Sequence, residues 1–113
     1  MEFIEVAGEK YPARWPIGPL RAFMAKCGFS TKLKDMGEMQ KMDMEQLAEF
    51  THVGLTYGAK AADQPIPFTL DEINEVMEMH EAAKVMEAFG RQFEKAPQSE
   101  AKSSDANNDD EKN

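Results

Sequence analysis

The chain has 113 residues, of which 21 are acidic and 13 basic, giving a formal net charge of −8 at pH 7. This length predicts one domain with a small core. A chain this acidic would be repelled by phosphate backbones, and its basic residues form no continuous stripe, which excludes nucleic acid as a partner. No window approaches the roughly 18 apolar residues of a membrane span, and Met1–Glu5 does not resemble a signal peptide. Together with a lone cysteine, Cys27, these features predict a cytoplasmic protein.

The first predicted element is a β-hairpin. Phe3–Val6 and Tyr11–Trp15 are rich in aromatic and β-branched residues, and they are separated by Ala7–Lys10. Within that turn, Gly8 can take the positive φ that a tight connection needs. Because a lone hairpin is marginal in water, we expect it to pack on helices.

Two helices are predicted to follow. Pro19 at the first helical position opens one, and Gly28 supplies its left-handed stop. A capping box of Asp43 and Gln46 opens the next, which Gly58 is expected to end. Between them, residues 30–42 allow a short helical turn. The predicted inner stripes are Leu20, Phe23, Met24 and Cys27 in the first helix, and Leu47, Phe50, Val53, Gly54 and Tyr57 in the second.

The last helical region begins at Thr69, which forms a capping box with Glu72. Its apolar positions change phase along the sequence, so we expect a bend or break near Met79–Ala83, and whether one helix or two form is left open. After Phe93 every residue is polar, charged, Ala or Pro, which predicts disorder because little surface can be buried to offset the entropy of ordering.

The predicted fold is therefore mainly α: a short N-terminal β-hairpin packed on three to four helices, with a disordered acidic C-terminal tail. Residues 1–93 form a single small domain and residues 94–113 the tail. In this arrangement the groups suited to chemistry are scattered singly along the chain.

No catalytic, metal or cofactor site is predicted. His80–Glu81 resembles the start of a zinc-protease helix, but Lys84 occupies the position of the second histidine. Cys27 lies on a buried stripe without a neighbouring histidine, as a packed small hydrophobe would. The carboxylates of residues 71–81 are expected to form a solvated helix face. A non-enzymatic protein is the prediction.

Methionine is the residue type in clearest excess, with nine copies. Four of them, Met36, Met39, Met42 and Met44, lie outside any clear helix stripe. Flexible thioethers can form an adaptable surface for a partner's apolar segment, but they also fill small irregular cores, and the two interpretations are left open. These four are the candidate protein-binding residues.

In the order and spacing of its motifs, the chain resembles the tail assembly chaperones of long-tailed bacteriophages and prophages. Each motif is short, and together they run from about residue 3 to residue 93. They are a Gly-x-x-Tyr-Pro hairpin in Val6–Pro12, a helix-opening Gly-x-Leu-Arg-x-Phe in Ile17–Phe23, an apolar-Gly-Leu step in Val53–Leu55, an acidic helix start in Phe68–Ile73, and a closing helix in Val85–Phe89.

The resemblance implies a non-enzymatic factor acting in the host cytoplasm during phage assembly. Such a chaperone binds and solubilises the apolar tape-measure protein and helps to recruit tail-tube subunits; self-association is left open. Two other functions stay open at this stage. One is a small structural adaptor or completion protein of a phage particle, and the other is a cytosolic regulator that binds a helical peptide.

Overall fold

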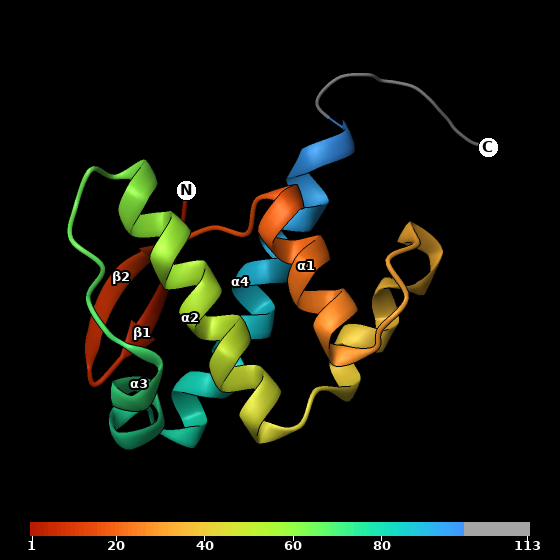
Figure 1. The fold of residues 1–113 in the computed structure, drawn as a ribbon. Coiled ribbons are helices and arrows are strands. Elements are labelled where there is room, and N and C mark those ends of the chain that lie inside the picture. Colours follow the sequence, from red (N-terminus) through yellow and green to blue (C-terminus); the bar gives the residue numbers. More distant parts are fainter. Residues whose placement is uncertain (99–113) are drawn as a thin grey trace.

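The computed structural model describes residues 1–98, and the side chains of residues 1–94. It bears out the mainly helical prediction with an N-terminal hairpin (Figure 1). The elements, in order, are β1 (Glu2–Val6), β2 (Glu9–Ala13), α1 (Ile17–Cys27), the 3₁₀ helix η1 (Leu33–Lys41), α2 (Met44–Ala61), α3 (Leu70–Val76) and α4 (Met79–Gln98).

The boundary predicted for the C-terminal tail falls inside a helix. α4 continues to Gln98, beyond the predicted domain end at Phe93. Residues 99–113, the rest of the predicted tail, lie outside the described residues.

The hairpin turn is tighter than predicted. Ala7 and Gly8 are its only connecting residues, with φ angles of 55° and 84°, and Val6 pairs with Glu9. Positive φ at both central residues is the signature of a type I′ turn, whose twist matches that of the flanking strands. The strands therefore include Glu9 and Lys10, which the sequence had placed in the loop.

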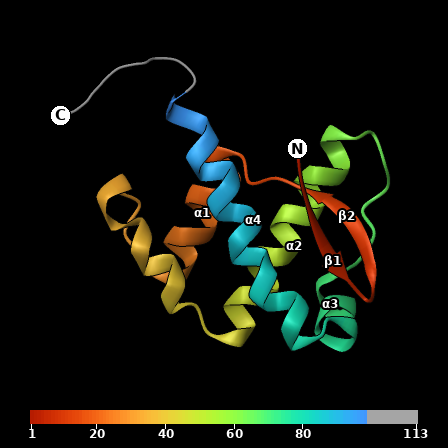
Figure 2. The same cartoon turned by 180° about the vertical axis from the view of Figure 1, so that it is seen from behind.

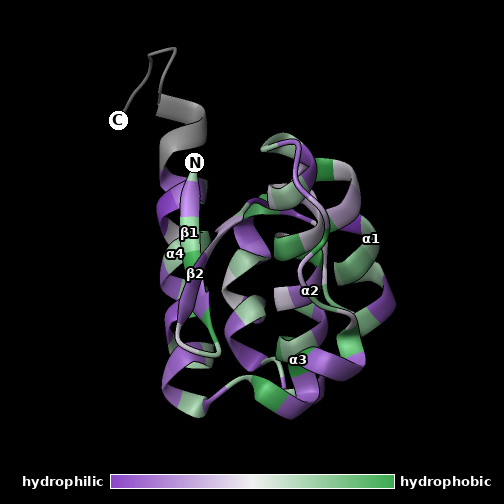
Figure 3. Cartoon of the chain, turned by 90° about the vertical axis from the view of Figure 1, so that its left-hand side faces the viewer, coloured by the Kyte–Doolittle hydropathy of each residue, from purple (hydrophilic) through white to green (hydrophobic). Residues whose placement is uncertain are grey.

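The hairpin packs against two helices, β2 against α2 and β1 against α4, and lies at one edge of the molecule in Figure 2. Its inner face contributes the buried side chains of Ile4, Val6 and Ala13. Along α2 and α4, hydrophobic and hydrophilic residues alternate around the helix, as in amphipathic helices (Figure 3). The prediction that the hairpin packs on helices is confirmed.

α2 approaches β2 so closely that glycine is required. The Gly54 carbonyl accepts a hydrogen bond of 3.1 Å from the Arg14 N–H, and a Cβ at Gly54 would lie 2.5 Å from the Trp15 ring. A Cβ at Gly58 would overlap the backbone carbonyl of Pro12. The prediction that Gly58 ends this helix was wrong, because Gly58 serves the contact with the hairpin and the helix continues to Ala61.

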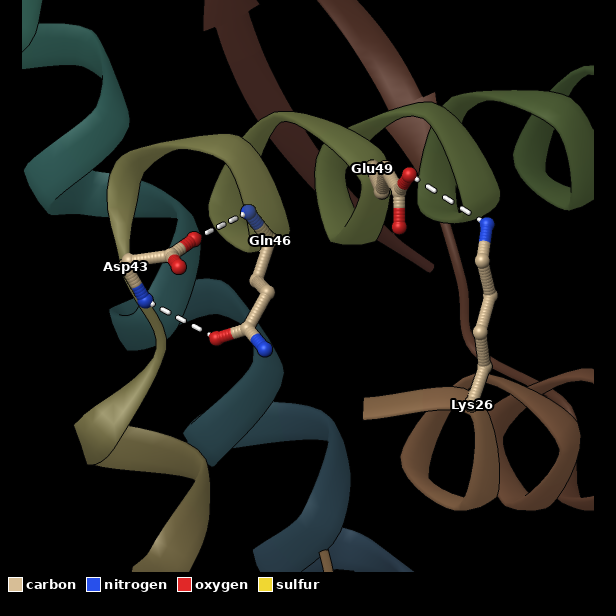
Figure 4. A network of polar contacts seen from close by, with 4 residues as sticks. All are labelled: Lys26, Asp43, Gln46 and Glu49. Atoms are coloured by element: carbon tan, nitrogen blue, oxygen red, sulfur yellow. Dashed lines mark hydrogen bonds and ion pairs between the residues drawn. The ribbon is translucent and has the colours of Figure 1, made fainter. Parts of the chain in front are cut away.

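The buried face of α2 is also rotated from the predicted stripe. Val53 and Tyr57 are only half-buried, whereas the small residues next to them face the hairpin. The residues that are buried are Phe50, Thr51, Gly54, Leu55, Gly58 and Ala59. The start of the helix is as predicted, since Asp43 and Gln46 form the full capping box, and Lys26 of α1 pairs with Glu49 one turn later (Figure 4).

α1 begins earlier than predicted and ends as predicted. Its first residue is Ile17, so Pro19 is the third helical residue rather than the first, a position where the backbone N–H is still unpaired within a helix. At the other end, Gly28 adopts a φ of 80° and the Phe29 N–H donates to the Met24 carbonyl at 2.9 Å. This is the Schellman-type stop expected for a glycine there.

The last helical region is two helices. α3 has the predicted capping box of Thr69 and Glu72, and the chain breaks at Met77 and Glu78 before α4 begins at Met79. The expected break is present, but it lies just before the predicted window of Met79–Ala83, whose residues belong to α4.

The prediction that the carboxylates of residues 71–81 form a solvated helix face was wrong for Glu81. Its side chain is buried, and its carboxylate accepts hydrogen bonds from the N–H groups of Ala7 (3.1 Å), Gly8 (2.8 Å) and Glu78 (2.9 Å). Burial by itself would raise the pKa of Glu81, but these hydrogen bonds lower it overall. One carboxylate therefore fastens the hairpin turn to the start of α4.

The core is an aromatic cluster centred on Phe50. Trp15 stacks on Phe50 with ring centroids 4.8 Å apart, and Phe89 meets Phe50 edge to face at 5.2 Å. Phe23 of α1 joins the cluster at 5.4 Å from Phe50. The Trp15 indole N–H donates to the Phe50 carbonyl at 2.9 Å, so the buried ring leaves no unpaired donor.

Candidate functional site

An apolar groove of about 480 Å³ lies between α1, η1 and the C-terminal half of α4. We call it the α1–η1–α4 groove. It is lined by Trp15, Ile17, Leu20, Arg21, Met24, Thr31, Leu33, Met36, Phe89, Gln92 and Phe93.

Helical periodicity brings the α1 wall together. Ile17, Leu20, Arg21 and Met24 stand at i, i+3, i+4 and i+7, so they share one face of the helix. Met24 is buried at the base of this wall, whereas Ile17 at the start of the helix is 77% exposed. Side-chain exposure along this wall therefore increases from the buried Met24 to the exposed Ile17.

Gln92 holds the opposite wall in place. Its side-chain oxygen accepts a hydrogen bond from the Trp15 N–H at 2.9 Å, and its amide nitrogen donates to the Trp15 carbonyl at 3.1 Å. This pair fixes α4 against the segment that leads into α1. Phe89 and Phe93 are four residues apart on α4, so they lie on one face of the helix, and both line the groove.

The third wall depends on a network at Ser30. The Ser30 hydroxyl donates to the Asp35 carboxylate at 2.6 Å, and the Ser30 N–H donates to the Glu38 carboxylate at 2.9 Å. These contacts tie the chain after α1 to η1, and they place Leu33 and Met36 along the groove. Both carboxylates are therefore hydrogen-bonded to a residue close to them in the sequence.

Exposed apolar side chains rim the groove. Leu33 is 77% exposed, like Ile17, and Phe93 is 39% exposed, while the base is formed by buried Trp15 and Phe89. Single exposed hydrophobic residues are ordinary, but several around one apolar groove are typical of a binding surface. The groove therefore presents exposed apolar side chains above a buried aromatic base.

The charge at the groove is basic. Among the lining residues that the structure describes, Arg21 is the one charged side chain, and Lys32 and Lys34 flank Leu33 as exposed residues. Within residues 1–94, the ion pairs are those of Lys26 with Glu49 and of Arg91 with Glu2, so none of these three cations is paired. A local basic rim thus stands out from a chain of net charge −8.

The four methionines predicted to bind a partner do not form one surface. Met36 lines the groove and is half-buried, and Met42 is half-buried against the core. Met39 is only 1% exposed and fills the core beneath η1, which agrees with the core-filling interpretation that the sequence left open. Met44 is 67% exposed, but it lies at a smaller pocket of about 160 Å³ beside Met77 and Met79.

Two other candidate reactive sites are accounted for by hydrogen bonding and burial. Glu5, His80 and Glu81 bring one potential ligand atom each within 4.8 Å of one another, but both Glu81 oxygens already accept backbone N–H groups. Cys27 is half-buried, and burial raises the pKa of its thiol, which disfavours the reactive thiolate.

Sequence reasoning missed Ile17 and Leu33 as surface residues. Because the helix was predicted to begin at Pro19, Ile17 was left outside it, although Ile17 stands at i−3 from Leu20 and i−7 from Met24 and fits their stripe. Leu33 is three residues from Met36, and residues at this spacing lie directly above one another in a 3₁₀ helix. Both signals were present in the sequence.

No helix within residues 1–98 combines the length and the hydropathy that a bilayer span requires. Comparison with models of protein families, with curated proteins and with solved structures gives no match.

Proposed function

We propose that this protein is a non-enzymatic tail assembly chaperone of a long-tailed phage or prophage. In this role it would bind and solubilise the tape-measure protein in the host cytoplasm and help to recruit tail-tube subunits. The observation that carries the proposal is the α1–η1–α4 groove, an apolar surface wide enough to receive an apolar segment and rimmed by exposed Ile17, Leu33 and Phe93. The family comes from the resemblance of the sequence motifs.

The geometry supports a binding role more than a chemical one. The groove lining offers hydrophobic side chains, one arginine and one threonine, and its glutamine is engaged with the Trp15 backbone. Such a lining suits the apolar face of a client helix, which would bury the exposed side chains of the rim. Full burial of a leucine or isoleucine side chain contributes roughly 1.5–3 kcal/mol.

Replacing Ile17 and Leu33 together by serine should abolish client binding while leaving the fold intact. Both side chains are 77% exposed, so their loss removes little packing from the monomer but much of the groove rim. The measurement is co-expression with a tape-measure protein. The client should be soluble with the parent chain and precipitate with the Ile17→Ser, Leu33→Ser variant.

The matched control replaces two exposed apolar residues elsewhere, Phe3 (55% exposed) and Ile66 (48% exposed), by serine. The client should stay soluble with this control. Equal solubility with both double variants would contradict the groove as client surface, and a client that precipitates even with the parent chain would contradict the chaperone function.

Purified particles distinguish the chaperone from a structural adaptor. A chaperone leaves the finished tail, so the protein should be absent from intact virions by mass spectrometry. A stoichiometric amount in virions would instead establish the adaptor function.

A further inference from the structure

The charges around the α1–η1–α4 groove indicate what kind of helix it binds. This inference rests on the proposed function, since it takes for granted that an apolar helical segment occupies the groove. No carboxylate lines the groove within the described residues, whereas Arg21 lines it and Lys32 and Lys34 flank it. Both carboxylates of η1, Asp35 and Glu38, are hydrogen-bonded to Ser30, and on α4 the exposed Glu94 follows the lining residue Phe93.

We infer that the partner of the groove is an amphipathic helix whose apolar stripe is flanked by aspartate and glutamate residues. Its apolar side chains would lie over Leu20, Met24 and Phe89, and its carboxylates would face Arg21 on one wall and the lysines on the η1 wall. Arg21 lies on the same wall of α1 as exposed Ile17, and Lys32 and Lys34 are the chain neighbours of exposed Leu33. Acidic residues on both sides of an apolar stripe match this layout.

The apolar lining of the groove argues against two other occupants. A second copy of this chain would bring a strongly acidic surface. To fill the groove it would also need an exposed apolar helix face, but the apolar faces of α2 and α4 are largely buried in the core. Residues 99–113 of the chain are acidic, but they contain no Val, Ile, Leu, Met, Phe, Tyr or Trp to fill an apolar groove.

The inference can be tested with two synthetic peptides of about 18 residues, long enough to form a helix. Both carry leucine at i, i+3, i+4 and i+7; one has glutamate and the other lysine at the flanking positions. Binding to the full-length protein is measured by fluorescence anisotropy at low salt. The glutamate peptide should bind about tenfold more tightly, as expected for two or three exposed ion pairs.

Protein variants assign this preference to the rim. Arg21→Glu combined with Lys34→Glu should remove or reverse the preference for the glutamate peptide. Raising the salt concentration to 0.5 M should reduce that preference, because salt screens exposed ion pairs. Lys10→Glu is the matched control, because Lys10 is exposed beside the hairpin turn, which Glu81 holds against the opposite end of α4. That control should leave the preference unchanged, and melting curves should show that all variants are folded.

The outcomes separate this inference from the proposed function. If both peptides bind with equal affinity, or the lysine peptide binds more tightly, the inference is overturned while the groove remains a helix-binding site. If neither peptide binds the parent chain, the groove is not a helix-binding site, and the proposed function and the inference fail together.

Discussion

Replacing Gly58 by alanine should destabilise the protein by about 3 kcal/mol or more, enough to unfold much of so small a domain. The added methyl group would overlap the Pro12 carbonyl and the backbone of Ala13, and backbone atoms cannot rotate away as a flexible side chain could. Relief requires α2 to move away from β2. That movement would strain the Arg14 to Gly54 hydrogen bond and the stacking of Trp15 on Phe50.

Thermal unfolding followed by circular dichroism provides the measurement, and a loss of this size should lower the melting temperature by more than about 12 °C. Gly90→Ala is the matched control, because Gly90 also lies inside a helix but a Cβ there meets nothing within 4 Å. That variant should gain about 0.5–1 kcal/mol from helix propensity. A Gly58 variant as stable as the parent would mean that α2 does not lie this close to the hairpin.

The local signals of the fold could be predicted from the sequence. The capping boxes at Asp43 and Thr69 and the stop at Gly28 depend on contacts within a few residues, and each is present as predicted. The role of Gly58 could not be predicted in this way, because glycine is both a helix stop and a close-contact residue. The choice between the two is made by Pro12, which lies far away in the sequence.

The candidate site was harder to predict because it is formed by three elements. Exposure of Ile17 and Leu33 depends on how α1 and η1 are placed, and that placement depends on the Gln92 and Ser30 hydrogen bonds. Methionine excess alone did not separate core from surface, since the half-buried Met36 lines the groove while Met39 of the same 3₁₀ helix is in the core. Residues 1–34 contain six basic and three acidic residues, but the sequence does not show that some of these cations lie at a groove.

Glu81→Gln should cost about 2–3 kcal/mol at pH 7, because the charged carboxylate joins the hairpin turn to α4. One Glu81 oxygen accepts from Ala7 and Glu78 and the other accepts from Gly8. A glutamine can keep an oxygen toward the first pair, but its NH₂ group would then face the Gly8 N–H, donor against donor. The matched control is Glu87→Gln, an exposed position on α4 that should change stability by less than about 0.5 kcal/mol.

We also expect the loss of stability caused by Glu81→Gln to depend on pH. The folded-state pKa of Glu81 lies below its ordinary value of 4.5, so its contribution is fully present above pH 4.5 and is lost as the pH falls through the folded-state pKa. Urea unfolding of parent and Glu81→Gln at several pH values should therefore give a difference in unfolding free energy that is constant near neutrality and shrinks below pH 4.5. The subtraction cancels the titration of the other carboxylates, which both proteins share. A difference that stays constant down to pH 3, or one that grows on acidification, would show that the Glu81 carboxylate does not hold the hairpin as a charged acceptor.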